Sequence, residues 1–348
     1  MSAPKVLKHG EHVNPHYAPA TGQTQSWAGK STDAERKGGE VSGIVTRYSK
    51  RERASTTPVA MGWIKADYLD AIEYTGSPQN VRGLLLLTGL IGVALLSFIA
   101  IPFSSVYGLD DWFIRWTGGF LVMPAMVFAG ICFIAWPARQ ELFRPADEPT
   151  IFDRAHRKVY RLFRETQPGF KGLFKPWPLR VCEYDWDLID TEHTATLATT
   201  GSTVTRYHAL VFIVKRSATD ATIIDSFNIG NGMELGEQTV PAVWEHIRRF
   251  MEERGPHLPP GDTLAPTQPP QTLWQSLGAV GPIGPKYLQW WKDQLPFMIL
   301  IHVLFPFFVP FFLLWGFFNW LSYKTATPVE WPQEVLDAVG DRSETARA

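Results

Sequence analysis

Two long apolar runs dominate the hydropathy pattern of the first half of the chain. Residues 84–103 include no charged side chain, and residues 113–136 include one, Arg115. A helix of about twenty residues is long enough to cross the hydrocarbon core of a bilayer, which is about 30 Å thick. The pattern therefore predicts a transmembrane helical hairpin over residues 83–136.

A third apolar run, residues 295–321, is interrupted by Pro306 and Pro310. Because proline kinks a helix, the run is compatible with one kinked transmembrane helix or with a re-entrant helical pair that turns at 305–310. Only Lys324 lies near the far end, so the charge rule favours a crossing. The aromatic and basic segment 273–294 before this run is typical of a membrane interface.

Charged residues around the hairpin predict its orientation. Asp110 and Asp111 lie between the first two apolar runs, whereas Arg139 and Arg144 follow the second. Since basic loops stay in the cytoplasm, the polar regions before and after the hairpin are predicted to be cytoplasmic. The predicted localisation is that of a multi-pass protein of the cell inner membrane.

Residues 149–255 have the patterns of a water-soluble domain. An apolar stripe of helical spacing predicts a helix over 239–255, capped by Thr239. Several antiparallel strands closed by one helix indicate an α+β domain, and the order resembles a pleckstrin-homology-like barrel. Alternating apolar and polar residues predict the strands at 150–153, 158–162, 181–189, 194–199, 203–215 and 221–227.

The predicted fold is therefore a membrane protein: a transmembrane helical hairpin and a third kinked apolar helix with a soluble α+β domain. Residues 1–57 are poor in large aliphatic side chains and are predicted to be disordered. Residues 58–82 are predicted to hold an amphipathic helix, at 64–74, on the membrane surface. The proline-rich residues 256–272 are predicted to form an extended linker, and residues 322–348 a C-terminal tail.

Composition narrows the classes of function. A net charge of -1 and a pI of about 6.8 disfavour a nucleic-acid-binding protein. The two cysteines, Cys132 and Cys182, lie in different segments and lack the spacing of a metal site. No motif for a catalytic nucleophile, a zinc site or a phosphate-binding loop is present. We therefore predict a non-enzymatic protein with no catalytic, metal-binding or cofactor-binding residues and no cofactor.

Two groups of charged residues in the polar region are candidate binding surfaces. Carboxylates that alternate along one strand could hold a hard cation or do acid–base chemistry. Their alternation with Tyr184 and Trp186 instead favours a solvent-facing or partner-binding surface. The acidic group is Glu183, Asp185, Asp187 and Asp190. A basic group that could contact anionic lipid is Arg154, Arg157, Lys158, Arg161 and Arg164.

Two polar side chains, His302 and Asn319, lie within the third apolar run. Polar groups inside a membrane are functional candidates, so these two residues are the sequence support for a small transporter component. The apolar runs carry few other polar residues, which favours hydrogen bonding between helices over a transport path.

Four stretches carry a resemblance to a known family. They are Phe152-Asp153-Arg154, Arg157-Lys158-Val159-Tyr160, the helix at 239–255, and the tail Pro328-Val329-Glu330-Trp331-Pro332-Gln333-Glu334-Val335. Together with the apolar hairpin, these stretches resemble an uncharacterised family of bacterial inner-membrane proteins often encoded beside type VI secretion effector genes.

The resemblance implies a role as an immunity or accessory protein for a type VI secretion toxin. The predicted function is accordingly a non-enzymatic inner-membrane binding protein, whose partners are membrane lipid and a secreted toxin or secretion-system protein. A membrane-anchored sensor, a lipid-binding module and a small transporter component are the alternatives.

Overall fold

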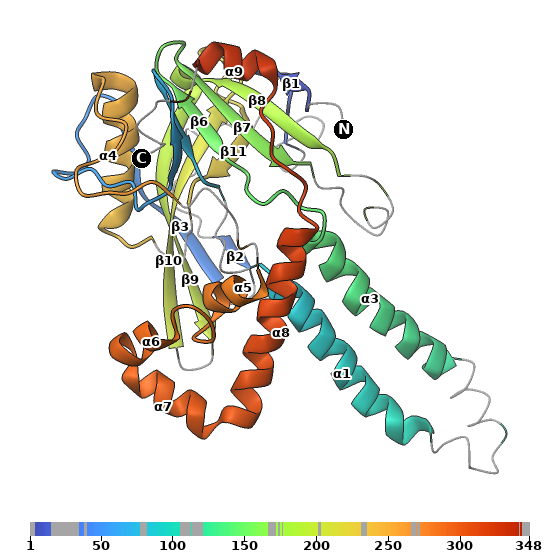
Figure 1. Ribbon diagram of the computed structural model, residues 1–348. Helices are drawn as coiled ribbons and strands as arrows, with labels where there is room; N and C mark the ends of the chain where they lie inside the picture. The colour runs from blue at the N-terminus through green and yellow to red at the C-terminus, as the bar shows by residue number, and fades with distance from the viewer. Residues whose placement is uncertain are drawn as a thin grey trace.

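Two β-sheets and a layer of helices make up the protein, which is therefore of mixed α/β class (Figure 1). The computed structural model describes residues 4–14, 35–37, 40–76, 82–104, 112, 121–165, 172, 175, 177–200, 203–230, 235–265, 270, 272–340 and 342.

Sheet A has six strands in the spatial order β1-β8-β7-β6-β5-β4. Strand β1 runs parallel to β8, and the other neighbours are antiparallel. Its side chains alternate between two apolar faces: Phe152 packs on one side and Ile151 on the other. The strands are β1 (Val6–Leu7), β4 (Ile64–Asp67), β5 (Ala71–Tyr74), β6 (Thr150–Asp153), β7 (Lys158–Arg164) and β8 (Leu179–Asp185).

Sheet B has five antiparallel strands in the order β11-β10-β9-β3-β2. A 3-10 turn, Trp186–Leu188, links it to β8 of sheet A. The long β9–β10 hairpin keeps its register from Thr203 opposite Thr200 to Val214 opposite Ile189. The strands are β2 (Glu35–Lys37), β3 (Glu40–Tyr48), β9 (Ile189–Thr200), β10 (Thr203–Lys215) and β11 (Ile223–Asn228).

Two amphipathic helices cover the sheets. Helix α4 (Thr239–Glu253) closes the core that both sheets share, where Trp244 stacks on Trp186 with ring centroids 5.9 Å apart. Helix α9 (Gln333–Val339) covers the other face of sheet A and buries Val335 and Val339 there. Each face of sheet A is therefore packed.

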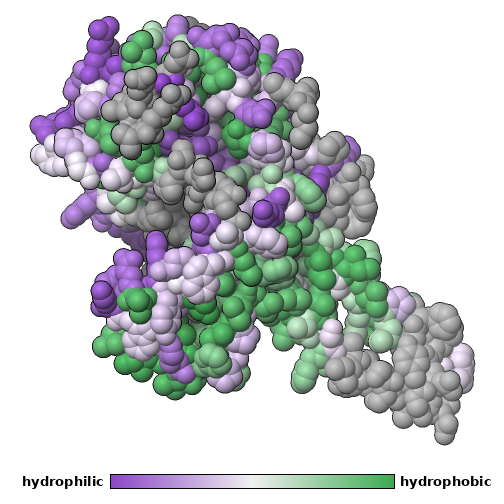
Figure 2. Space-filling model, in the orientation of Figure 1, coloured by the Kyte–Doolittle hydropathy of each residue, from purple (hydrophilic) through white to green (hydrophobic). Residues whose placement is uncertain are grey.

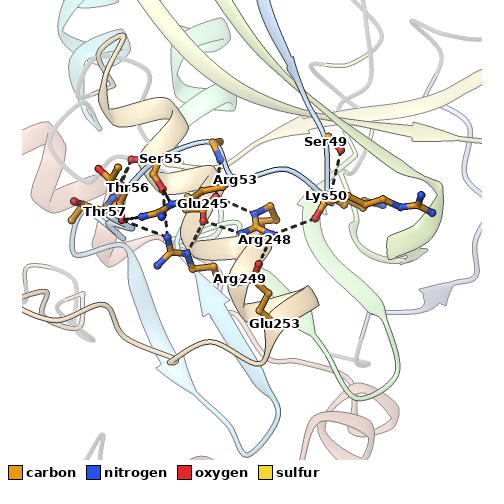
Figure 3. A network of polar contacts seen from close by, with 12 residues as sticks. Ser49, Lys50, Arg53, Ser55, Thr56, Thr57, Glu245, Arg248, Arg249 and Glu253 are labelled. Atoms are coloured by element: carbon orange, nitrogen blue, oxygen red, sulfur yellow. Dashed lines mark hydrogen bonds and ion pairs between the residues drawn. The ribbon is translucent and has the colours of Figure 1, made fainter.

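A buried polar network lies between α4 and the segment that follows β3 (Figure 3). The Glu245 carboxylate accepts hydrogen bonds from Arg248, from Arg249 at 2.6 Å and from the backbone N–H of Ala54 at 2.9 Å. Arg248 in turn donates to the carbonyl of Lys50 at 3.4 Å. The network attaches the segment after β3 to α4.

The helical layer projects from the sheets (Figure 1). Helices α1 and α3 pack so closely that a Cβ added at Gly89 would lie 2.3 Å from the carbonyl oxygen of Phe133. Helix α8 packs against α5 across Gly316 in the same way. The helices are α1 (Leu84–Ser104), α3 (Met123–Glu141), α5 (Leu273–Val280), α6 (Tyr287–Asp293), α7 (Leu295–Val303) and α8 (Phe305–Lys324).

The predictions of a transmembrane hairpin and of a multi-pass inner-membrane protein are wrong. In the part of the chain that the structure describes, α8 alone is long and apolar enough to cross a bilayer. Within α1, the apolar stretch whose side chains are described, Leu84–Ile99, is shorter than a crossing requires. Helix α3 ends in the polar residues Arg139, Gln140 and Glu141, which reduce its apolar length.

The third apolar run is two helices that meet at Leu304, and not one kinked helix. Pro306 lies in the first turn of α8, where proline fits because its missing N–H has no helical partner. It therefore starts a helix here. Pro310 lies inside α8, which continues through it.

The predicted α+β domain with a barrel-like order is also wrong, although its strands at 150–153, 158–162 and 203–215 and its helix at 239–255 are confirmed. The six predicted strands divide between two sheets, and each sheet is completed by strands from the first 74 residues. Thr239 is the first residue of α4, and its N-cap is Gln238.

Three flanking segments also differ from their predictions. Residues 64–74, predicted to be helical, form the β4–β5 hairpin, because β5 pairs with β6. Within residues 1–57, predicted to be disordered, β1 pairs with β8 and β3 with β9. The predicted linker contacts the hairpin and the residues before it: the N–H of Ala265 donates to the carbonyl of Ile64 at 2.7 Å, and the Asp262 carboxylate accepts hydrogen bonds from the N–H groups of Ala60 and Gly62.

The buried His246 is expected to make the free energy of unfolding depend on pH. His246 Nε2 donates to the carbonyl of Pro256 at 3.2 Å, so Nδ1 accepts from the Tyr74 hydroxyl at 2.5 Å. Burial lowers the pKa of His246 to about 4. Its contribution to stability is therefore complete above about pH 6.5 and is lost as the pH falls towards 4.

We expect the free energy of unfolding, measured by denaturant titration, to fall over that pH range less steeply in His246→Gln than in the natural protein. Equal slopes for His246→Gln and the natural protein would contradict the prediction.

Candidate functional site

Large apolar side chains are exposed over the helical layer, which we call the apolar helical face. Figure 2 shows them gathered at the lower end of the molecule, below the polar surface of the sheets. A water-soluble monomer rarely exposes a continuous apolar patch larger than a few hundred Å². The exposed residues include Leu85, Ile91, Leu95, Phe98, Val127, Phe128, Ile131, Ile134, Ile299, Leu300, Val303, Phe307, Leu313 and Phe317.

Arg82 joins three of these helices at their base, which we call the helix junction. Its guanidinium donates to the Ser322 hydroxyl at 3.0 Å, to the Pro145 carbonyl at 2.7 Å and to the Glu141 carbonyl at 3.4 Å. The same group lies 4.6 Å from the ring centroid of Tyr323. A single buried side chain thus ties the start of α1 to the ends of α3 and α8.

Glu141 is the second buried ion of the helix junction. Its carboxylate accepts hydrogen bonds from the N–H groups of Leu85 at 3.0 Å and Leu86 at 3.2 Å. These amides belong to the first turn of α1, which has no helical acceptor for them and attracts negative charge. Burial raises the pKa of Glu141, while the two amides and the Arg82 charge oppose that shift.

The two polar residues predicted within the third apolar run lie in different places. Asn319 belongs to the helix junction and donates to the carbonyl of Arg82 at 3.0 Å. His302 donates through Nδ1 to the Met298 carbonyl at 2.7 Å and lies 3.1 Å from the Tyr287 hydroxyl. His302 also lines an apolar cavity of about 640 Å³ between α6, α7 and α8. The structure does not bring these two residues together.

The predicted acidic and basic surfaces contact each other. In sheet A, β7 and β8 are antiparallel neighbours, and Lys158 lies opposite Asp185. Opposite charges on adjacent strands pair across the ladder. The ion pairs are Lys158–Asp185, Lys158–Glu183, Lys8–Glu183, Arg157–Asp187, Lys215–Asp190, Arg154–Asp70 and Arg161–Asp225.

Arg164 differs from the other predicted basic residues. It lies at the end of β7, and its guanidinium stacks over the ring of Trp177 near Arg139, at the base of α3. The structure thus separates Arg164 from the paired charges of sheet A and places it beside the helix junction.

Residues 125–341 match a family described as a family of unknown function, DUF6708. This segment is more than half of the chain. The chain belongs to this family. The family segment begins inside α3 and ends beyond α9, so it contains Glu141 and Ser322 of the helix junction but not Arg82. Neither the curated proteins nor the solved structures include a significant match.

Sequence reasoning missed Arg82 and Glu141. A signal was present for Arg82, a single charged residue two positions before an apolar run, whereas Glu141 lies five residues after Trp136 and between Arg139 and Arg144. Charges at such positions are typical of interfacial anchors, and nothing in their spacing shows that they share one buried network.

Proposed function

We propose that this protein is a non-enzymatic, lipid-associated binding protein whose apolar helical face contacts the acyl chains of a membrane. The exposed apolar face carries the proposal. Removing one large apolar side chain from water contributes roughly 1.5–3 kcal/mol. Ten of the exposed side chains would therefore contribute on the order of 15 kcal/mol to lipid association.

The distribution of apolar residues favours lipid over a protein groove. A helix that binds one groove needs a single apolar stripe, whereas a helix that is apolar all round suits a bilayer or a protein interior. On α3 the exposed residues Val127, Ile131 and Ile134 share one side of the helix, and Phe133 and Trp136 are exposed on the opposite side. The proposal requires insertion of this face into lipid and no multi-pass topology.

Vesicle flotation tests the proposal. Purified full-length protein, diluted from detergent, is expected to float with phosphatidylcholine vesicles and to aggregate when detergent is removed without lipid. Val127→Lys combined with Ile131→Lys should lower vesicle binding at least tenfold, because charges oppose insertion.

The matched control replaces two exposed apolar residues of sheet B, Val45 and Leu197, with lysine. This control should float like the natural protein. A full-length chain that stays monodisperse without detergent and does not float would contradict the proposal. The secreted-toxin partner implied by the family resemblance stays a prediction.

A further inference from the structure

Four arginines from separate segments gather where the apolar helices meet the sheets. The Arg164 guanidinium donates to the carbonyl of Arg139 at 3.4 Å, and the Arg82 guanidinium donates to the carbonyl of Arg144 at 3.3 Å. The guanidinium carbons of Arg139 and Arg164 lie 5.2 and 4.6 Å from the ring centroid of Trp177. We call Arg82, Arg139, Arg144 and Arg164 the arginine cluster.

The cluster has more positive than negative charge. Its neighbouring acids are Glu141, which caps α1, and Glu148, which pairs with Arg144 at 3.1 Å. Four arginines and two glutamates leave two unbalanced positive charges. Burial and the charges of Arg139 and Arg144 lower the pKa of Arg164 to about 10.

Three of the four arginines form no ion pair with any described residue, whereas Arg144 pairs with Glu148. Within the described part of the chain, neither Arg139 nor Arg164 forms an ion pair, although Arg164 is only 8% exposed. The Nε atom of Arg139 is buried and has no acceptor. Burying a cation without a counterion is unfavourable, so an anion at this place would stabilise the cluster.

The position of the cluster indicates which anion it binds. Trp136 and Phe143, both at the base of α3, are exposed beside it, as aromatic residues are at lipid–water interfaces. Arg144, 42% exposed, is within reach of a headgroup at that depth. Arginine binds phosphate oxygens through its planar donors. We propose that the arginine cluster binds the phosphate groups of anionic phospholipids, with Arg139 and Arg144 in contact and Arg82 and Arg164 adding to the positive potential.

This inference rests on the proposed lipid association and names the lipid class. The experiment compares flotation of full-length protein with phosphatidylcholine vesicles and with vesicles that also contain phosphatidylglycerol. Each basic residue near an anionic surface strengthens binding roughly fivefold. Arg139→Gln combined with Arg144→Gln should therefore lower the preference for anionic vesicles by about tenfold to thirtyfold, and Arg144→Gln alone by about fivefold.

The matched control removes two equally charged residues elsewhere, by Arg206→Gln combined with Arg216→Gln, each 44% exposed. Its preference for anionic vesicles should change less than twofold. If the natural protein floats equally with neutral and anionic vesicles, the headgroup inference is overturned and the lipid association stands. The same conclusion follows if the two double variants lose equal amounts of the preference for anionic vesicles. Absence of flotation with either vesicle would overturn both proposals.

Discussion

Replacing Arg82 with alanine is expected to lower the free energy of unfolding by about 3–5 kcal/mol. The guanidinium donates to Ser322, Pro145 and Glu141, and all of these contacts are buried. Each buried acceptor that loses its donor destabilises the fold by about 1–3 kcal/mol, and water cannot replace the donor inside packed helices. The variant also removes the cation beside the Glu141 carboxylate.

Denaturant titration in detergent, followed by tryptophan fluorescence, measures this loss. Arg82→Lys keeps the charge but not the planar donors, so it should recover only part of the stability. The control is Arg216→Ala, which removes an exposed ion pair with Asp220 and should change stability by less than about 1 kcal/mol. A loss for Arg82→Ala no larger than that of the control would show that the helices are held without this network.

The elements that local pattern determines were predictable from sequence. In β6 and β7, alternate residues face two apolar cores, so the period of two that predicts a strand is the period that packing requires. The helix at α4 follows from Val243, Ile247 and Phe250, which share one side of a helix and are all buried.

Pairing between distant segments could not be read from local pattern. The apolar side chains of residues 64–74 have spacings that suit a helix or a strand. These residues form strands because β5 pairs with β6, although α1 and α3 separate the two strands in the sequence. Strand β1 has two residues and exists through β8. Strand β1 is therefore determined by its pairing with β8, and β8 lies far outside any short stretch of sequence around β1.

The candidate site was only partly predictable for a related reason. Arg164 was singled out, but the acceptors of Arg82 include main-chain carbonyls, whose positions depend on the fold. Carbonyl groups leave no trace in a sequence motif. The pairing of the acidic with the basic residues could have been predicted from the sequence. Oppositely charged residues on antiparallel neighbouring strands form ion pairs across the ladder, as Lys158 and Asp185 do.

Replacing Glu245 with alanine is expected to lower the free energy of unfolding by about 3–5 kcal/mol and to release residues 50–56 from α4. The carboxylate is fully buried and receives donors from Arg248, Arg249 and Ala54 (Figure 3). Its loss leaves the Arg248 guanidinium, itself 4% exposed, with Glu253 as its remaining carboxylate. A buried cation that loses one of its two carboxylate partners destabilises the fold more than an exposed cation that loses a partner, because water cannot solvate the buried charge.

Acidification should reproduce the effect of this substitution. Burial alone would raise the pKa of Glu245, but the hydrogen bonds from Arg248, Ala54 and Arg249 lower it to about 2. The stabilisation is therefore complete above about pH 4.5 and is lost as the pH falls towards 2. Glu245→Gln should lose this part of the acid dependence, because an amide does not titrate.

Limited trypsin digestion distinguishes release of the segment from general unfolding. Cleavage after Lys50, Arg51 and Arg53 should become at least tenfold faster in Glu245→Ala under conditions in which α4 and the sheets stay folded. Glu253→Ala is the control, because its carboxylate is 55% exposed and contacts the same Arg248 from outside. An unchanged cleavage rate in Glu245→Ala would mean that β3 and its pairing with β9 hold the segment, whatever the charge on α4.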